Sequence, residues 1–379
     1  MGFRIGIDAH AAERDGTGNC TYIRNLLLEL ASIDRENRYF IYAINPMHPF
    51  YDRIKIYKNY VIKSLFFKNP LFRIPLSLVI RAFLDKIDLL HVQYIAPPLH
   101  SGKLVVTIHD LAHFDIPWSF SRFEVLRSRL LIPLSAKKAK KILTGSAYSS
   151  YCIREKFRLP DSKLVITPYG VNPILFKLEK GKLTRSAEEL KRKYGIKAPY
   201  ILSLSRLNFR KNLTLLIKAF EILKNEKNMP HQLVIAGIKD VGSEEVRKIA
   251  EKSLYYNDII FTGYVPDEDL AYLYGSAEVF VFLSEYEGFG LPVLEAMACG
   301  VPVVTYASTS LPEVAKDAAL YVSELNPLSV AEKIRQLFED ADLHLYLKQK
   351  GKERAKLFTW EETAKLTLKV YNEILHGKN

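Results

Sequence analysis

The strongest constraint on the fold is a strand, loop, helix, strand pattern between residues 279 and 305. Residues 279–283 form the apolar run VFVFL, a loop follows, a ten-residue helical pattern comes next, and VPVV closes the unit. Two short β-branched runs on either side of a helix are typical of a βαβ unit in a parallel sheet. The loop at residues 285–290 is therefore expected at the carboxyl edge of that sheet, where open α/β folds bind ligands.

Two carboxylates accompany this loop. Glu287 precedes the helix and Glu295 lies within it, so at a helical rise of about 1.5 Å per residue they would lie roughly 12 Å apart along one side. That is about the length of a nucleotide sugar from hexose to ribose. Gly288 and Gly290 let the backbone approach a ligand, and free amides at the helix start favour a phosphate. The alternative is a helix-capping Glu287 and a solvated Glu295.

Strand and helix patterns alternate along the whole chain. Strands are expected at residues 3–8, 39–44, 89–94, 104–108, 141–144 and 164–167, and the alternation restarts at residue 200. Repeated alternation of this kind predicts doubly wound α/β domains. A polar, lysine-rich passage at residues 172–186 contains a proline and a glycine and is typical of a linker. We place the domain boundary near residue 177.

Composition supports two globular domains with an uneven charge. The chain has 379 residues, of which 48% are hydrophobic, enough to bury substantial cores. The net charge is +12, and residues 1–175 hold 25 Lys and Arg against 14 Asp and Glu. A basic first half favours an anionic partner, either a phospholipid surface or a polyanion. A generally high lysine content is the alternative explanation.

One helical run in the first half is typical of an interfacial helix. Residues 120–135 carry arginines beside apolar residues, and a lysine cluster follows. We expect this surface to dock the protein on an anionic membrane that holds a lipid-linked acceptor. The charged residues concerned are Arg122, Arg127, Arg129, Lys137, Lys138, Lys140 and Lys141.

The sequence favours a cytoplasmic location for the protein. Its three cysteines are too widely spaced for a metal cluster and odd in number, which fits a reducing compartment. The first residues enter a strand pattern directly, so no cleaved signal is expected. The most apolar tract, residues 65–84, contains three basic residues and two prolines and is too interrupted to span a bilayer. We therefore expect a cytoplasmic protein that is peripheral on the inner face of the membrane.

Cations flank the first loop of the second half. Arg206 and Lys211 stand on either side of the loop that follows the strand beginning at residue 200. Negative charge develops on a departing nucleoside diphosphate; a guanidinium can hold two phosphate oxygens, and an ammonium acts as a movable point charge. Both cation types are thus chemically suited to hold a diphosphate. Two solvated cations are the alternative.

Two loops of the first half also lie at expected strand ends. Gly16 and Gly18 could bring the backbone to a phosphate, although a plain turn is ordinarily the better explanation of such a pair. His109 and Asp110 follow another strand, and a histidine there is as often a buried hydrogen-bonding residue as a catalytic one.

Residues 287–304, EGFGLPVLEAMACGVPVV, resemble the signature of the retaining, nucleotide-sugar-dependent glycosyltransferases of family 4. In that family two glutamates separated by seven residues face the donor. SRL followed by RKN resembles the diphosphate clamp of the family, and FTWEETAKLTLKVY resembles its closing helix. The resemblance implies an α/β protein of the GT-B architecture, with two facing Rossmann-like doubly wound domains and a C-terminal helix that crosses back to the first. Residues 1–177 with 360–379 would bind the acceptor, and residues 178–359 the nucleotide sugar.

The resemblance also implies roles for particular residues. Glu287 would hold the donor hexose and Glu295 the ribose, while Asn172 stands where an aspartate is common in the family. Arg210 is the less favoured third cation, and Gly237 would leave room for the nucleotide. The catalytic set is His109, Arg206, Lys211 and Glu287. The donor set is Gly16, Gly18, Tyr264, Val265, Gly288, Phe289, Gly290, Leu291 and Glu295, and the acceptor set is Asp110 and His113.

The resemblance predicts transfer of a hexose from a nucleoside diphosphate sugar to a saccharide or lipid-linked saccharide in cell-surface polysaccharide or lipopolysaccharide synthesis. Mannose from GDP-mannose is favoured, and UDP-glucose, UDP-galactose and UDP-GlcNAc stay open. No cofactor and no metal are expected, because Arg206 and Lys211 can neutralise the charge that a divalent ion would otherwise neutralise. A nucleotide-sugar 2-epimerase and a basic polyanion-binding scaffold are the alternatives. No nucleic-acid partner is expected, since no such motif accompanies the aromatic residues of the first half.

Overall fold

The computed structural model describes residues 2–176, 187–227 and 229–377, and its chain divides into two compact units. The first unit comprises Met1–Gly170 and Thr359–Asn379, and the second comprises Val171–Phe358. The predicted boundary at residue 177 falls outside the described residues.

The first unit is built on a seven-stranded sheet in the order β3-β2-β1-β4-β5-β6-β7, with parallel pairing throughout. Both faces are covered, so the central strands read as buried apolar runs rather than as alternating patterns. The strands are β1 (Arg4–Asp8), β2 (Arg38–Ala43), β3 (Tyr60–Ser64), β4 (Leu89–Gln93), β5 (Lys103–Thr107), β6 (Lys141–Thr144) and β7 (Leu164–Ile166).

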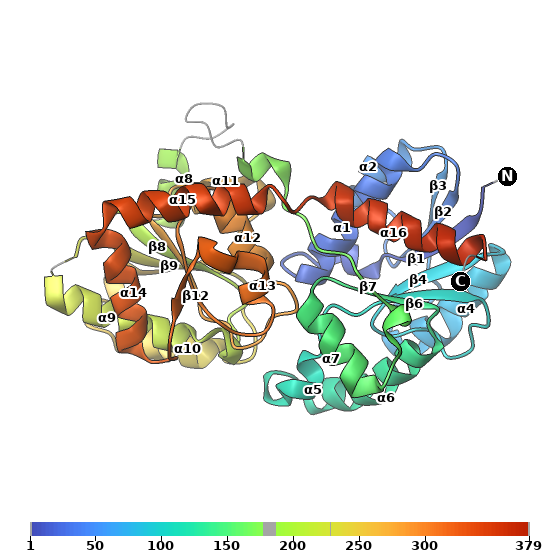
Figure 1. Ribbon diagram of the computed structural model, residues 1–379, viewed down its shortest axis with the longest axis horizontal. Coiled ribbons are helices and arrows are strands. Elements are labelled where there is room, and N and C mark those ends of the chain that lie inside the picture. Colours follow the sequence, from blue (N-terminus) through green and yellow to red (C-terminus); the bar gives the residue numbers. More distant parts are fainter. Residues whose placement is uncertain (1, 177–186, 228, 378–379) are drawn as a thin grey trace. The chain divides into compact units, whose positions relative to one another are not determined.

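Helices lie on both faces of this sheet (Figure 1). On one face, α4, α6 and α7 pack their apolar residues against β2, β4, β5 and β6 in a single buried cluster. On the other, α1 packs against α16. The helices of the unit are α1 (Gly18–Ile33), α2 (Asp52–Lys55), α3 (Pro70–Phe72), α4 (Leu78–Leu84), α5 (Ala112–Asp115), α6 (Arg122–Lys138), α7 (Ala147–Phe157) and α16 (Trp360–Leu375).

The last helix belongs to the first unit, as the GT-B expectation requires. Thr359 caps α16, and the Trp360 ring stacks on Tyr169 with centroids 5.9 Å apart. The Tyr371 hydroxyl bonds to His91 of β4, whose other ring nitrogen lies 2.7 Å from the Thr107 hydroxyl. Burial lowers the pKa of His91 to about 3, so this link between helix and sheet stays neutral at physiological pH.

The second unit repeats the plan with a six-stranded parallel sheet in the order β10-β9-β8-β11-β12-β13. Its strands are β8 (Tyr200–Leu204), β9 (Gln232–Ala236), β10 (Ile259–Gly263), β11 (Val279–Phe282), β12 (Val303–Tyr306) and β13 (Leu320–Val322). Helices α9, α10 and α14 pack on one face around a buried apolar cluster. The helices are α8 (Ala187–Tyr194), α9 (Leu213–Lys227), α10 (Ser243–Glu251), α11 (Asp267–Gly275), α12 (Leu291–Ala298), α13 (Leu311–Ala315), α14 (Pro327–Glu339) and α15 (Ala341–Ala355).

The sequence analysis missed two strands, β3 and β13, which each form one edge of a sheet. Only the first residue of β3 is buried, and two of the three residues of β13 are half-buried. Short edge strands lack the continuous apolar run that marks a strand covered on both faces, so the apolar pattern did not reveal them.

Candidate functional site

The candidate site lies where the strand order of the second sheet reverses. The chain winds from β8 through β9 to β10 on one side, and then returns to place β11 beside β8. The loops after β8 and β11 therefore diverge from a topological switch point, the position at which open α/β sheets bind ligands. These loops carry the cations at residues 206–211 and the carboxylate at residue 287.

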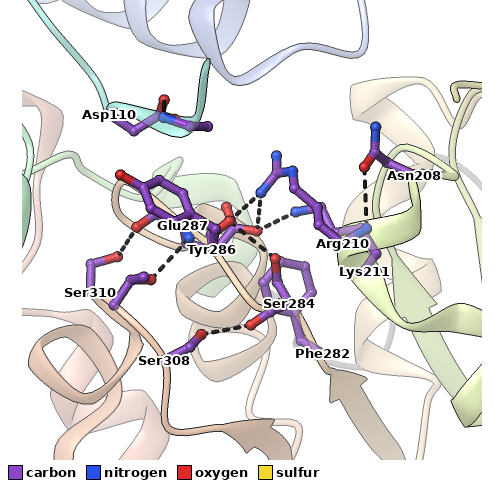
Figure 2. Close-up of polar contacts among 12 residues, drawn as sticks. Asp110, Asn208, Arg210, Lys211, Phe282, Ser284, Tyr286, Glu287, Ser308 and Ser310 are labelled. Atoms are coloured by element: carbon purple, nitrogen blue, oxygen red, sulfur yellow. Dashed lines mark hydrogen bonds and ion pairs between the residues drawn. The ribbon is translucent and has the colours of Figure 1, made fainter. Parts of the chain in front are cut away.

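A third loop holds the Glu287 segment in place. The amide of Glu287 donates to the Thr309 hydroxyl at 2.9 Å, and the Ser310 hydroxyl donates to the Glu287 carbonyl at 3.0 Å. The Ser308 hydroxyl donates to the Ser284 carbonyl at 2.6 Å. Figure 2 shows Ser308 and Ser310 on one side of this segment, with Arg210 and Lys211 on the other. The backbone of the loop is thus fixed by hydroxyls from the loop after β12.

Lys211 and Arg210 converge on the Glu287 carboxylate. The Lys211 ammonium forms an ion pair with Oε1 of Glu287, and Nη1 of Arg210 donates to the same oxygen at 3.1 Å. The Arg210 guanidinium also donates to the Tyr286 carbonyl. Lys211 is only 8% exposed and its ammonium lies 4.6 Å from the centre of the Phe282 ring. One carboxylate therefore faces two cations at the ligand-binding edge of the sheet.

This arrangement keeps Glu287 ionised. Burial opposes ionisation of the carboxyl, but the charges of Lys211 and then Arg210 outweigh that cost and lower the pKa of Glu287. Two cations against one carboxylate leave a surplus of positive charge for a phosphate, while the carboxylate can accept hydrogen bonds from sugar hydroxyls.

Arg206 lies in the same loop but has a different partner. Its Nε is 3.3 Å from Oδ2 of Asp240, and its side chain is 47% exposed. Asn208 donates to the same Asp240 oxygen at 3.2 Å and caps the short helical turn Phe209–Lys211. The structure therefore brings Lys211, but not Arg206, into contact with Glu287. Arg206 remains a predicted diphosphate ligand on an accessible side chain.

Glu295 lies on α12 in a different environment. The hydroxyl of Tyr274, a buried residue of α11, donates to Oε2 of Glu295 at 3.0 Å. Burial raises the pKa of the Glu295 carboxyl to about 7. Residues 287–290 are not helical, since α12 begins at Leu291, so the helical rise does not set the spacing of the two glutamates. Ribose binding by Glu295 stays a prediction.

The Glu295 pKa predicts a pH-dependent stability. Because the folded-state pKa of about 7 exceeds its ordinary value of 4.5, the neutral carboxyl favours folding below pH 4.5, and this contribution is lost as pH rises through 7. The resulting decrease in the free energy of unfolding is at most about 3 kcal/mol. Glu295→Gln stays neutral, so its urea midpoint should exceed that of the wild type clearly at pH 8 and only slightly at pH 5. The exposed Glu268 of α11 provides the control Glu268→Gln, and an equal difference at both pH values would contradict the prediction.

The start of α12 brings backbone close to this edge. Gly290 caps the helix with φ of +102°, and a Cβ there would lie 2.5 Å from Cδ2 of Leu311. Both the dihedral and the contact require glycine at this position. The predicted donor residues Gly288 and Phe289 are buried, and Leu291 is half-buried at the first position of the helix.

The remaining predicted donor residues lie at other strand ends. Tyr264 and Val265 follow β10; Tyr264 is 43% exposed and Val265 is buried. In the first unit, Gly16 has φ of +72° in the loop after β1, and a Cβ on Gly18 would meet nothing within 4 Å. The contacts of these residues with a donor stay predictions.

His109 is buried at the end of β5, and both of its ring nitrogens have partners. Nδ1 bonds to the Tyr169 hydroxyl, and Nε2 lies 2.8 Å from Oε1 of Gln93. Burial lowers its pKa to about 3, so the ring is neutral at physiological pH. A substrate contact would require one of these hydrogen bonds to exchange. The catalytic role of His109 therefore remains a prediction.

The two predicted acceptor residues follow His109. A carboxylate oxygen of Asp110 accepts from the Ala112 amide at 3.0 Å, and the His113 ring stacks on Phe120 with centroids 4.1 Å apart. Both side chains are partly exposed, and their contact with an acceptor is untested.

Sequence reasoning gave too little weight to Arg210 and missed the serines that fix the loop. Arg210 stands next to Lys211 in the sequence, so residue type alone could not separate it from Arg206. The Arg210 carbonyl also accepts from the Glu285 amide at 2.9 Å. This hydrogen bond ties the loop that carries the cations to the loop that carries Glu287. The STS run at residues 308–310, in the loop after β12, is the sequence feature that indicates the hydroxyls which fix the loop.

Comparisons with known proteins identify the family of the chain. Residues 186–354 match the family model for glycosyl transferases group 1, and residues 18–174 match the model for glycosyltransferase family 4. O-antigen chain mannosyltransferase B of Escherichia coli is 33% identical over 278 residues, covering 72% of this chain and 71% of that protein. The MMP alpha-(1->4)-mannosyltransferase of Mycolicibacterium hassiacum is 30% identical over 246 residues, covering 63% and 56%.

A solved structure shows the same fold. Anabaena HepE in complex with UDP and glucose has a TM-score of 0.74 at 16% identity, covering 98% of this chain and 100% of that one. Two doubly wound parallel sheets and a last helix that belongs to the first unit define the GT-B fold, and the family and relative matches make the protein a glycosyltransferase. The chain belongs to glycosyltransferase family 4. Neither alternative, the 2-epimerase or the polyanion-binding scaffold, finds support in these matches.

Proposed function

We propose that the protein transfers mannose from GDP-mannose, with retention of anomeric configuration, to a saccharide or lipid-linked saccharide in the synthesis of a cell-surface polysaccharide. The observation that carries the proposal is the convergence of Lys211 and Arg210 on Glu287 at the switch point. The names of the two mannosyltransferase relatives support mannose as the sugar and, for the Escherichia coli protein, an O-antigen chain as the product.

The loop cations and the carboxylate take separate roles in this proposal. Lys211, with Arg206 and Arg210, binds the diphosphate, and Glu287 accepts hydrogen bonds from the mannose hydroxyls. Amides from residues 288–291 position the donor, and Glu295 holds the ribose. The bond between the anomeric carbon and the diphosphate oxygen breaks, and the acceptor oxygen bonds to that carbon from the same face. The proton of the acceptor hydroxyl passes to the departing diphosphate, so no protein nucleophile is needed.

The cations make a divalent ion unnecessary in this mechanism. Preorganised positive groups stabilise charge on the leaving diphosphate in the way that a metal ion does in other transferases. We expect transfer to be unaffected by EDTA. In the first unit, His109, Asp110 and His113 would lie on the acceptor side, and the loop of Gly16 and Gly18 would cover the donor.

A nucleotide screen tests the donor. Purified protein is melted with GDP, UDP, GDP-mannose, UDP-glucose, UDP-galactose and UDP-GlcNAc, and GDP-mannose should raise the thermal midpoint most. Transfer to a mannose-terminated acceptor should then give an α-linked product. A larger shift with a UDP sugar would overturn the choice of GDP-mannose, and a β-linked product would overturn retention.

We also propose that the first unit docks on an anionic membrane through α6. Four large apolar side chains of this helix are 59–63% exposed, and their spacing of three, four and four residues places them on one side. They are Phe123, Leu126, Leu130 and Leu134. Exposed arginines and lysines of the same helix supply charge for anionic lipids. Among the described residues, no helix is long and apolar enough to cross a bilayer.

Vesicle cosedimentation tests this docking. The protein should sediment with phosphatidylglycerol vesicles more than with phosphatidylcholine vesicles, and the triple variant Leu126→Ser, Leu130→Ser, Leu134→Ser should lose most of this binding. The control carries Leu254→Ser, Leu328→Ser and Leu345→Ser, which change leucines of the second unit that are at least as exposed. Equal recovery of the α6 variant and the control would remove the proposal.

A further inference from the structure

A buried glutamine of the first unit has one open donor group. Gln93 is the last residue of β4 and is only 8% exposed. Its side-chain nitrogen, Nε2, is buried and has no hydrogen-bond partner among the described residues. An unpaired buried N–H donor is unfavourable, and buried polar groups in folded proteins nearly always have a partner. Nε2 of Gln93 therefore needs an acceptor atom that the described part of the chain does not supply.

His109 determines which end of this amide stays open. Oε1 of Gln93 lies 2.8 Å from Nε2 of His109. Burial lowers the pKa of His109 to about 3, so the ring is neutral and only one of its nitrogens carries a proton. Because an amide oxygen can only accept, Nε2 of His109 donates to Gln93, and Nδ1 accepts from the Tyr169 hydroxyl. This chain of hydrogen bonds ends on Oε1 and leaves the amide nitrogen of Gln93 to face another group.

The ring of His109 is itself held in place. Three tyrosine rings pack edge to face against it, with centroids 4.8–5.6 Å away; they belong to Tyr22, Tyr94 and Tyr169. The Ser149 hydroxyl also donates to the His109 carbonyl at 3.2 Å. A ring packed in this way keeps its orientation, so the amide of Gln93 is held in a fixed direction before any ligand binds.

The backbone next to Gln93 is strained. Tyr94 has φ of +59°, and across it the Ile95 amide donates to the Gln93 carbonyl at 2.7 Å. A three-residue turn with a positive φ at its centre is the rare, strained form of the γ-turn. Strain of this kind in a residue other than glycine is concentrated at ligand sites. The open donor therefore lies beside a backbone feature that is typical of a binding site.

The place of Gln93 in the sheet agrees with this reading. The strand order of the first sheet reverses between β1 and β4, and Gln93 stands at the carboxyl end of β4. The carboxyl ends of strands at such a reversal are where doubly wound sheets bind ligands.

A hydroxyl group suits the open donor better than an anion. The groups that orient Gln93 are neutral, since burial lowers the pKa of His109 and raises that of Tyr169 well above its usual range. A buried anion would meet no opposing charge among these groups and would be unfavourable. A sugar hydroxyl is neutral, and its oxygen can accept from an amide N–H.

We propose that Gln93 is a substrate-binding residue that donates a hydrogen bond from Nε2 to a sugar hydroxyl, and that His109 is a positioning residue that acts through Gln93. This inference rests on the proposed sugar transfer and adds to it a residue that selects for one hydroxyl of a sugar substrate. The hydroxyl belongs either to the acceptor saccharide or to the hexose of the donor, and the experiment separates these two sources.

Deoxy sugars test the inference with the full chain. Transfer rates are measured with GDP-mannose and methyl α-mannoside, and then with each monodeoxy analogue of either mannose that keeps the accepting hydroxyl. For one analogue, the wild-type kcat/KM should fall roughly tenfold below that of the parent sugar, because Nε2 of Gln93 is left unpaired. Gln93→Met should show this loss already with the parent sugar and no further loss with that analogue, while its discrimination at the other positions stays at the wild-type value.

Two further variants separate binding from a structural role. His109→Phe keeps an aromatic ring among the tyrosines but no longer holds Oε1 of Gln93, so it should weaken the discrimination at the same position. The control is Gln232→Met, at a buried glutamine that begins β9 and accepts from the Lys197 and Ala198 amides through Oε1. It should lower the thermal midpoint and keep the wild-type discrimination at every position.

The outcomes are distinct. Discrimination lost for an acceptor analogue assigns the hydroxyl to the acceptor, and discrimination lost for a donor analogue assigns it to the donor hexose; either result supports the role of Gln93. Wild-type discrimination at every position in Gln93→Met would overturn that role and leave Gln93 as a structural partner of His109. If Gln93→Met does not fold, full discrimination in His109→Phe would overturn the inference. Absence of transfer by the wild type from any nucleotide sugar would refute the proposed function, and this inference with it.

Discussion

Lys211→Ala is expected to slow sugar transfer by about 100-fold or more, because it removes a preorganised charge at the point where the diphosphate departs. Lys211 is held in place by its ion pair with Glu287 and by the Phe282 ring, so a water molecule cannot replace it with the same geometry. The affinity for GDP should fall in the same variant, since the free diphosphate carries the charge that Lys211 binds. Steady-state transfer rates and calorimetric titration with GDP provide the two readouts.

The matched control for this variant is Lys218→Ala, which removes an exposed lysine of α9. It should keep the wild-type transfer rate and GDP affinity. A Lys211→Ala protein with near-normal transfer would show that the diphosphate is neutralised elsewhere.

Glu287→Gln is expected to reduce transfer by about 100-fold or more while GDP binding is retained, because it removes the proposed contact with the mannose hydroxyls and leaves the cations in place. The variant should also be less stable than the wild type. Two partly buried cations lose their counter-charge, and breaking a buried ion pair by removing one partner costs about 3–5 kcal/mol. Nucleotide should recover part of this stability by binding the released cations.

Transfer assays and thermal melts with and without GDP measure these effects, with Glu268→Gln as the control. The two variants should therefore differ in their affinity for GDP: Lys211→Ala loses it, and Glu287→Gln keeps it. Loss of GDP affinity in Glu287→Gln with the fold intact would assign Glu287 to the nucleotide instead of the hexose.

Most of the fold could be predicted from periodicity. A strand covered on both faces, such as β11, is a continuous apolar run, and polar residues at the ligand edge follow it. The last helix was assigned to the first unit from its resemblance to the family, because its own amphipathic pattern does not say which sheet covers it. The edge strands β3 and β13 were missed because they are partly exposed.

The sequence identified which loops form the candidate site, but not which of their residues contact one another. The sequence placed cations after β8 and carboxylates after β11, and the parallel pairing of these strands brings their loops together. Which cation meets Glu287 depends on the short turn Phe209–Lys211, where Asn208 caps the backbone and the Asn212 φ of +52° turns the chain into α9. A one-dimensional pattern does not encode that turn, so Arg206 was favoured over Arg210.

Hydrogen–deuterium exchange with and without GDP tests most directly whether the nucleotide sits at the switch point of the second sheet. The account predicts that GDP slows exchange in residues 205–212 and 284–291, and that Lys211→Ala abolishes this protection at the same GDP concentration. Protection confined to the first unit, or protection of the two loops that survives in Lys211→Ala, would contradict it.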